Sequence, residues 1–187
     1  MPLNIPNLLT WGRIFLIPFV VGVFYLPIPA VEQNILATVA FVIAAITDWF
    51  DGWLARKLKQ SSAFGAFLDP VADKLMVAAA LVMLVQLGRA DALLAFIIIG
   101  REIAISALRE WMAKIGAAKS IAVSFIGKLK TTAQMVAIPL LLWHAPLDGI
   151  DVHAAGTLLL WIAALLTLWS MAYYLIKAIP EISALER

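Results

Sequence analysis

Residues 48–74 read DWFDGWLARKLKQSSAFGAFLDPVADK. Asp48 and Asp51 are three residues apart, and Asp69 and Asp73 are four apart, so each pair lies on one face of a helix. Residues 56–62 between the two pairs, RKLKQSS, are mostly basic and polar, whereas the sequence beyond the pairs on both sides is strongly apolar. The stretch therefore predicts two apolar helices whose ends lie side by side and gather four carboxylates in a small volume.

The chain as a whole has the composition of an integral membrane protein. Hydrophobic residues make up 64% of the 187 residues and charged residues 14%, against roughly 45–50% and 25% in a soluble domain. The mean hydropathy is +0.97. Runs of about 20 apolar residues can span a bilayer, and such runs lie roughly at 12–30, 35–57, 66–87, 92–113, 130–146 and 154–177. We expect an all-α membrane protein with six transmembrane helices, forming a single domain over residues 1–187.

The basic residues indicate which helix ends face the cytoplasm. Six spans place both termini on one side of the membrane, and all of the 14 lysines and arginines except Arg89 fall near that side. Cytoplasmic segments of membrane proteins are enriched in lysine and arginine. Both termini and the loops at 56–65 and 110–130 are therefore expected to be cytoplasmic.

The first ten residues are too short and too polar to span a membrane. They contain Pro2, Asn4, Pro6 and Asn7, which favours a short helix along the membrane surface that turns into the first span. A frayed terminus with an asparagine cap is the alternative. A secretory signal is disfavoured, because no basic segment precedes the first apolar run and further spans follow.

The four aspartates predict a metal site built from oxygen ligands. The chain has no cysteine and only two histidines, His144 and His153, so a zinc site cannot be assembled. Carboxylates at membrane depth are costly unless cations neutralise them. Ligation by carboxylates alone favours Mg²⁺, Mn²⁺ or Ca²⁺. Four such groups suit two ions about 4 Å apart that clamp a reacting phosphate.

A simpler interpretation treats the aspartates as interfacial groups paired with the neighbouring basic residues Arg56, Lys57, Lys59 and Lys74. Two glycines argue against it. Gly52 directly follows Asp51, and Gly65 lies one turn before Asp69. Glycine weakens a helix but permits close approach of a ligand or of another helix, so the glycines favour a binding site.

These residues also form the signature of a known family. The pattern D-x-x-D-G-x-x-A-R-x8-G-x-x-x-D-x-x-x-D of the CDP-alcohol phosphotransferases is matched at every fixed position by Asp48, Asp51, Gly52, Ala55, Arg56, Gly65, Asp69 and Asp73. Three further stretches resemble the bacterial phosphatidylglycerophosphate synthases within that family: NIPNLLTWGR at 4–13, GREIAISALREW at 100–111 and GKLKTTAQM at 127–135. Residues after about Trp143 carry no diagnostic pattern.

The resemblance implies roles for individual residues. Asp48, Asp51, Asp69 and Asp73 would bind two Mg²⁺ or Mn²⁺ ions that hold the CDP pyrophosphate, and Asp73 would also be the general base. The residues implied at the CDP-lipid site are Asn7, Thr10, Arg13, Gly52, Ala55, Arg56 and Gly65. Asn7, Thr10 and Arg13 recur every three residues and so share a helical stripe; interfacial anchoring is the alternative for Asn7 and Arg13.

The acceptor site is expected among basic residues at the cytoplasmic ends of the fourth and fifth spans. Arg101, Arg109, Lys128 and Lys130 gather there, with Thr131 predicted to cap the fifth span and to touch a phosphate. Guanidinium groups match phosphate oxygens, so the acceptor is expected to carry a phosphate. Glu102 and Glu110 are expected to partner the two arginines. Ordinary positive charge on the cytoplasmic side is the alternative, and it is preferred for Lys114 and Lys119.

The predicted reaction is transfer of the phosphatidyl group from CDP-diacylglycerol to sn-glycerol 3-phosphate, giving phosphatidylglycerophosphate and CMP. Inositol phosphate, serine or choline remain alternative acceptors. The resemblance also implies a homodimer among the lipids of the bacterial cytoplasmic membrane, with the active site facing the cytoplasm. No nucleic-acid partner is expected.

A divalent cation transporter is the hypothesis from a different class. Transport sites usually lie near the bilayer midplane, whereas these aspartates adjoin a basic loop, and this disfavours transport. The aromatic residues late in the chain, namely Trp143, Trp161, Trp169, Tyr173 and Tyr174, are interpreted as interfacial belts and packing, with no chemistry assigned.

Overall fold

The computed structural model describes residues 5–58, 63–116, 125–146, 149 and 151–185. Within these ranges the side chains of 5–8, 49, 51–58, 63–64, 66, 125–126, 128 and 181–185 are outside the description. The described residues are helical with no strand. The elements are α1 (Ile5–Gly22), the 3-10 turn η1 (Val23–Tyr25), α2 (Ala30–Leu58), α3 (Ala63–Gln86), α4 (Ala92–Lys114), α5 (Phe125–Trp143) and α6 (Val152–Leu185).

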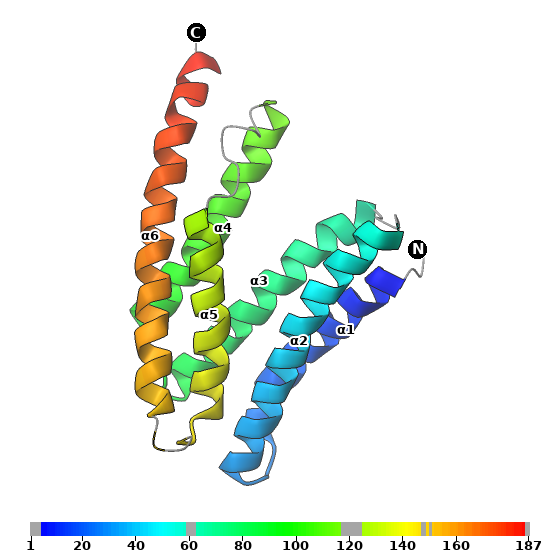
Figure 1. Cartoon of the computed structure of the whole chain (residues 1–187), viewed down its shortest axis with the longest axis vertical. Helices are drawn as coiled ribbons and strands as arrows, with labels where there is room; N and C mark the ends of the chain where they lie inside the picture. Colours follow the sequence, from blue (N-terminus) through cyan, green and yellow to red (C-terminus); the bar gives the residue numbers. More distant parts are fainter. Residues whose placement is uncertain (1–4, 59–62, 117–124, 147–148, 150, 186–187) are drawn as a thin grey trace.

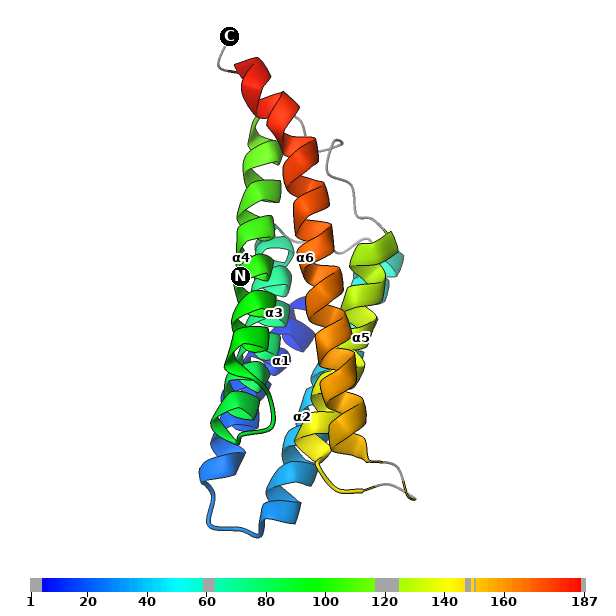
Figure 2. The same cartoon turned by 90° about the vertical axis from the view of Figure 1, so that its left-hand side faces the viewer.

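Successive helices run in opposite directions, so the chain passes back and forth along one axis (Figure 1). The segments between α1 and α2, between α3 and α4, and between α5 and α6 lie at the lower end in this view. Helix α1 packs against α2 and α3, while α6 packs against α4 and α5. The last turns of α4 and α6 project beyond the other helices at the upper end, as Figure 2 also shows. The upper end therefore gathers the carboxylates of α2 and α3 and the basic residues of α4 and α5.

The predicted apolar runs correspond to the helices, and the all-α prediction is confirmed for the described residues. The prediction of a separate short helix before the first span is wrong for residues 5–22, because these residues form the continuous helix α1. Pro6 falls in its first turn, where a missing backbone N–H costs nothing. Helix α5 begins at Phe125, five residues before the predicted boundary at 130. Helices α1 and α5 thus begin before their apolar segments, because neighbouring residues outside those segments also adopt helical hydrogen bonding.

The outer surface of the bundle is apolar. Large side chains such as Phe15, Phe96 and Trp169 are exposed by 71%, 72% and 68%, whereas the main buried cluster joins residues of all six helices. Soluble proteins rarely expose such extended apolar surface. Two segments, Ala30–Asp48 and Val152–Pro180, are long and apolar enough to cross a membrane, and Leu9–Tyr25 and Leu129–Trp143 are shorter apolar helices. The chain is therefore suited to a membrane environment.

Hydrogen bonds stabilise the helix ends at the lower end of the bundle (Figure 1). Gly88 adopts φ +68°, and the N–H of Arg89 donates to the carbonyl of Leu84 at 2.8 Å, so a glycine turn ends α3. The Arg89 guanidinium donates to the carbonyl of Leu142 at 3.0 Å and thereby caps α5. Asp91 accepts from the N–H of Leu93 at 2.8 Å and caps the start of α4. Arg89, the one basic residue predicted for this side, thus has a structural role.

Gly156 permits the closest approach of α5 and α6. A Cβ atom at this position would lie 2.8 Å from Leu141 Cγ and 3.3 Å from the carbonyl oxygen of Ala137. We expect Gly156→Ala to destabilise the fold by about 1–3 kcal/mol, the usual cost of overpacking, and to lower the melting temperature in detergent. Gly100→Ala is the matched control, since a Cβ on Gly100 of α4 meets nothing within 4 Å. Equal melting temperatures for the two variants would contradict this packing.

Candidate active site at the polar end of the bundle

Helix α1 supplies two side chains to the carboxylates of α2 and α3. Arg13 is almost fully buried, with 1% of its side chain exposed, and its Nη1 lies 2.6 Å from Asp48 Oδ1. The hydroxyl of Thr10, also buried, donates to Asp69 Oδ1. Thr10 and Arg13 are three residues apart and therefore lie on one face of α1. Two of the three residues of the predicted stripe thus contact aspartates that are predicted metal ligands.

Asp73 lies between the carboxylates and the basic residues. It is half-buried in α3, one turn after Asp69. One small cavity is lined by Asp73 together with Arg13, Met76 and Met135. A second cavity, of about 20 Å³, is lined by Asp73 with Lys74, Glu102, Lys130, Thr131 and Gln134. Such a volume holds about one water molecule. Asp73 therefore lines two small cavities whose remaining walls include residues of α1, α2, α4 and α5.

Several predicted residues lie outside the described side chains. They are Asn7, Asp51, Gly52, Ala55, Arg56 and Lys128. Their backbones belong to α1, α2 and α5, so Asp51 is in the turn of α2 that follows Asp48. Gly65 is described, and it is buried in the first turn of α3.

The chemistry of the donors fits hard divalent ions. Asp48, Asp69 and Asp73 offer oxygen atoms from neighbouring turns of two packed helices, and Mg²⁺ and Mn²⁺ prefer such ligands. The buried guanidinium of Arg13 on Asp48 shows that the pocket already accommodates positive charge. Among the described side chains, which do not include Asp51, no three histidines or carboxylates lie close enough together to hold a metal ion. To hold a metal ion, these three carboxylates would have to come closer together and be joined by a fourth donor from α2.

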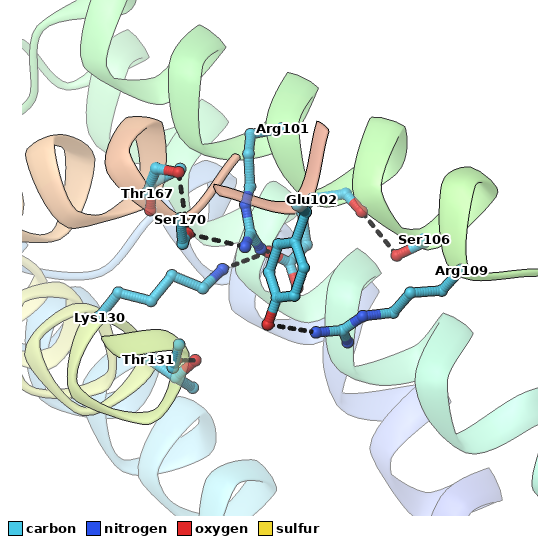
Figure 3. Close-up of polar contacts among 10 residues, drawn as sticks. Arg101, Glu102, Ser106, Arg109, Lys130, Thr131, Thr167 and Ser170 are labelled. Carbon is cyan, nitrogen blue, oxygen red and sulfur yellow. Dashed lines mark hydrogen bonds and ion pairs between the residues drawn. The ribbon is translucent and has the colours of Figure 1, made fainter. Parts of the chain in front are cut away.

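The basic residues form a second cluster where α4, α5 and α6 meet (Figure 3). The carboxylate of Glu102 joins two buried cations, since its Oε2 lies 2.7 Å from Lys130 Nζ and 3.1 Å from Arg101 Nη1. The other terminal nitrogen of Arg101, Nη2, donates to Ser170 Oγ at 2.8 Å. Arg101, Glu102 and Lys130 are thus drawn together from two helices, and Glu102 is the predicted partner of Arg101.

Arg109 lies two turns after Arg101 on α4, and its Nη2 donates to the hydroxyl of Tyr174 at 3.0 Å. The expected pairing of Arg109 with Glu110 is wrong, because Glu110 pairs with Lys114 at 2.9 Å on the exposed surface. Lys114 thus belongs to an exposed ion pair rather than to the basic cluster. Thr131 does not cap α5, since it lies in the second turn and donates to the carbonyl of Gly127 at 3.0 Å.

Two residues of this cluster were not predicted from the sequence. From the sequence no role is expected for Ser170, and Tyr174 is interpreted as part of an interfacial belt or of the packing. Thr167, Ser170 and Tyr174 are spaced three and four residues apart within an otherwise apolar helix, so their oxygen atoms lie on one face. A polar stripe in an apolar segment is the signal that could have identified them, because polar groups in membranes usually face the bundle interior.

The chain belongs to the CDP-alcohol phosphatidyltransferase family, whose model matches residues 3–169. Members of this family generally use divalent metal ions. The chain is also 55% identical over 180 residues to the CDP-diacylglycerol–glycerol-3-phosphate 3-phosphatidyltransferase of Salmonella choleraesuis (strain SC-B67), an alignment that covers 95% of this chain and 96% of that protein. The proteins of the same name from Escherichia coli (strain K12) and Shigella sonnei (strain Ss046) are each 54% identical with the same coverage.

Proposed function

We propose that this chain transfers the phosphatidyl group of CDP-diacylglycerol to sn-glycerol 3-phosphate. The acceptor hydroxyl oxygen forms a bond to the β-phosphorus, while the bond from that phosphorus to the oxygen of CMP breaks. The hydroxyl proton passes to Asp73, and CMP leaves. The observation that carries this proposal is 55% identity, over nearly the whole of both chains, to a protein named for this reaction.

The placement of Asp73 supports its role as general base. A base must lie within hydrogen-bond reach of the hydroxyl that it deprotonates. Asp73 shares a cavity with Lys130 and Thr131, and Lys130 is joined through Glu102 to Arg101. An acceptor whose phosphate binds the basic cluster would therefore extend its free hydroxyl toward Asp73. Lys128 completes the proposed phosphate site from the same helix as Lys130.

The opposite side of Asp73 is the proposed CDP-lipid site. Two Mg²⁺ or Mn²⁺ ions bound by Asp48, Asp51, Asp69 and Asp73 would neutralise the pyrophosphate and stabilise the departing CMP. Thr10 and Arg13 hold Asp69 and Asp48 in place, which supports including them in this site. Asn7, Gly52, Ala55, Arg56 and Gly65 complete the proposed set.

The proposed setting is the bacterial cytoplasmic membrane, crossed six times by a single domain that comprises residues 1–187. Both termini and the active site face the cytoplasm in this arrangement. The alternating helix directions support it (Figure 1), as does the gathering of basic residues at one end. A homodimer is proposed as the assembly.

The proposed function is tested by measuring CMP release from CDP-diacylglycerol by the purified protein. We expect release with sn-glycerol 3-phosphate in the presence of Mg²⁺ or Mn²⁺, and at least a hundredfold less with inositol phosphate, serine or choline, because a site shaped for one polar acceptor leaves buried groups unpaired with another. Chelation of divalent ions should abolish release, and adding them back should restore it. Absence of CMP release with sn-glycerol 3-phosphate would refute the assignment.

A further inference from the structure

Tyr174 lies between the two arginines of α4 at the centre of the basic cluster. Its side chain is fully buried, with 0% exposed. Its hydroxyl accepts a hydrogen bond from Arg109 Nη2 at 3.0 Å. Its ring centre lies 5.1 Å from Cζ of Arg109 and 5.8 Å from Cζ of Arg101. One aromatic side chain of α6 therefore contacts both guanidinium groups.

Ser170 complements Tyr174 one turn earlier on α6. It is buried, accepts from Arg101 Nη2 at 2.8 Å and donates to the carbonyl of Thr167 at 3.0 Å. Ser170 and Tyr174 thus engage Arg101 and Arg109 respectively. Both residues lie beyond the segment matched by the family model, which ends at residue 169. The second half of α6 therefore adds two residues to a cluster otherwise built from α4 and α5.

These contacts restrict two long cationic side chains before any ligand binds. A free arginine loses rotamer entropy when it is fixed, and a site that is already ordered avoids this loss when it binds a ligand. The two guanidinium groups nevertheless still have unused hydrogen-bond donors. Within the described part of the chain, Nε of Arg101 and Nε of Arg109 are buried and have no hydrogen-bond partner. Buried donors without partners are costly, and a bound anion would satisfy them.

The charge of the cluster matches a phosphate monoester. Among the described side chains, which do not include Lys128, Arg101, Arg109 and Lys130 carry three formal positive charges and Glu102 carries one formal negative charge, which leaves +2. A phosphate monoester carries a charge of about −1.5 to −2 at pH 7. The excess positive charge is thus balanced by one dianionic phosphate.

We propose that Tyr174 is a positioning residue that fixes Arg109 and Arg101 for the phosphate of the acceptor. This inference rests on the proposed function, because it assigns the phosphate to the acceptor substrate. Tyr174 acts through the two arginines and does not itself need to touch the substrate. Ser170 assists Tyr174 by accepting a hydrogen bond from Arg101.

The test compares Tyr174→Phe with Tyr173→Phe. Tyr173 is the neighbouring residue, exposed by 40%, and its ring centre lies 4.8 Å from Lys177 Nζ and 5.9 Å from the ring centre of Tyr174. We expect Tyr174→Phe to raise the KM for sn-glycerol 3-phosphate about tenfold, the low end of the effect of a hydrogen bond to a charged group. The KM for CDP-diacylglycerol should stay within twofold of the wild-type value, and Tyr173→Phe should leave both constants unchanged.

The variant Arg109→Ala separates positioning from general destabilisation. Arg109→Ala should itself raise the KM for the acceptor, and adding Tyr174→Phe to it should change that KM by less than twofold, because the arginine through which the hydroxyl acts is gone. An undiminished tenfold effect in the double variant would overturn the proposal. So would equal changes in both KM values accompanied by a lower melting temperature.

Equilibrium binding distinguishes failure of this inference from failure of the proposed function. Titration of the purified protein with sn-glycerol 3-phosphate and with inorganic phosphate measures the dissociation constant without turnover. Weaker binding of both anions by Tyr174→Phe and Ser170→Ala supports the positioning role even if the wild-type protein released no CMP. Unchanged dissociation constants in both variants would overturn it whatever the reaction catalysed.

Discussion

Replacement of Asp73 by asparagine is expected to reduce CMP release by about 10²–10⁴-fold, the usual contribution of a general base. The substitution keeps the size of the side chain but removes the group that accepts the proton. Asp73 is the carboxylate that shares cavities both with Arg13 of the proposed CDP-lipid side and with Lys130 of the proposed acceptor side. Removal of its charge should therefore stop turnover while both substrates still bind.

Binding measurements decide whether the loss is chemical. We expect Asp73→Asn to retain binding of CDP-diacylglycerol in the presence of Mg²⁺ or Mn²⁺, because three other carboxylates remain. Glu110→Gln is the control for removal of a carboxylate outside the site, since Glu110 is exposed and paired with Lys114, and such surface pairs contribute little. Near-normal turnover by Asp73→Asn would refute the assignment of the base.

The helices could be predicted from the sequence because their cause is local. Apolar runs of sufficient length and the polar connections between them define six helices in the order found. The ends were less predictable. Residues 125–129 include Gly127 and Lys128, yet α5 begins at Phe125, because helical hydrogen bonding does not have to end where an apolar run ends. For the same reason, residues 5–11 and the start of the first predicted span form one continuous helix, α1.

The candidate site could be predicted as a set of residues but not as a set of contacts. The spacing of the aspartates places each pair on one helix face, whereas the pairing of Arg13 with Asp48 depends on how α1 packs against α2. Tyr174 was overlooked for a related reason. An aromatic residue in an apolar helix usually packs or anchors, and only the approach of α4 shows that its hydroxyl accepts from Arg109. Contacts between distant segments leave no pattern in a single sequence.

The relation between the two clusters follows from the helix directions. Asp73 comes from α3, and Glu102 and Lys130 come from α4 and α5, yet the three line one small cavity, and Glu102 joins Lys130 to Arg101. Because successive helices alternate in direction, each helix has one of its two ends on the same side of the bundle, and the charged segments meet there. A transfer reaction between two phosphate-bearing substrates needs two such clusters with a base between them.

Replacement of Arg13 by alanine is the second substitution with a large expected effect. Arg13 is buried, and its partner Asp48 keeps 39% of its side chain exposed. Removing one partner of a buried ion pair costs roughly 3–5 kcal/mol, and the partial exposure of Asp48 favours the lower end of that range. A loss of about 3 kcal/mol corresponds to a fall in melting temperature of roughly 6–12 °C for a chain of this length. CMP release should fall as well, since Asp48 loses the group that orients it.

A double substitution separates stability from function at this pair. Replacing a buried ion pair by neutral groups is often close to neutral for stability, so Arg13→Met combined with Asp48→Asn should recover much of the melting temperature lost in Arg13→Ala. Turnover should not recover, because a proposed metal ligand is then missing. Thermal unfolding in detergent and CMP release, measured on the same preparations, provide the two readouts. Recovery of turnover in the double variant would show that Asp48 is not needed for the reaction. A melting temperature unchanged by Arg13→Ala would show that the ion pair does not stabilise the bundle.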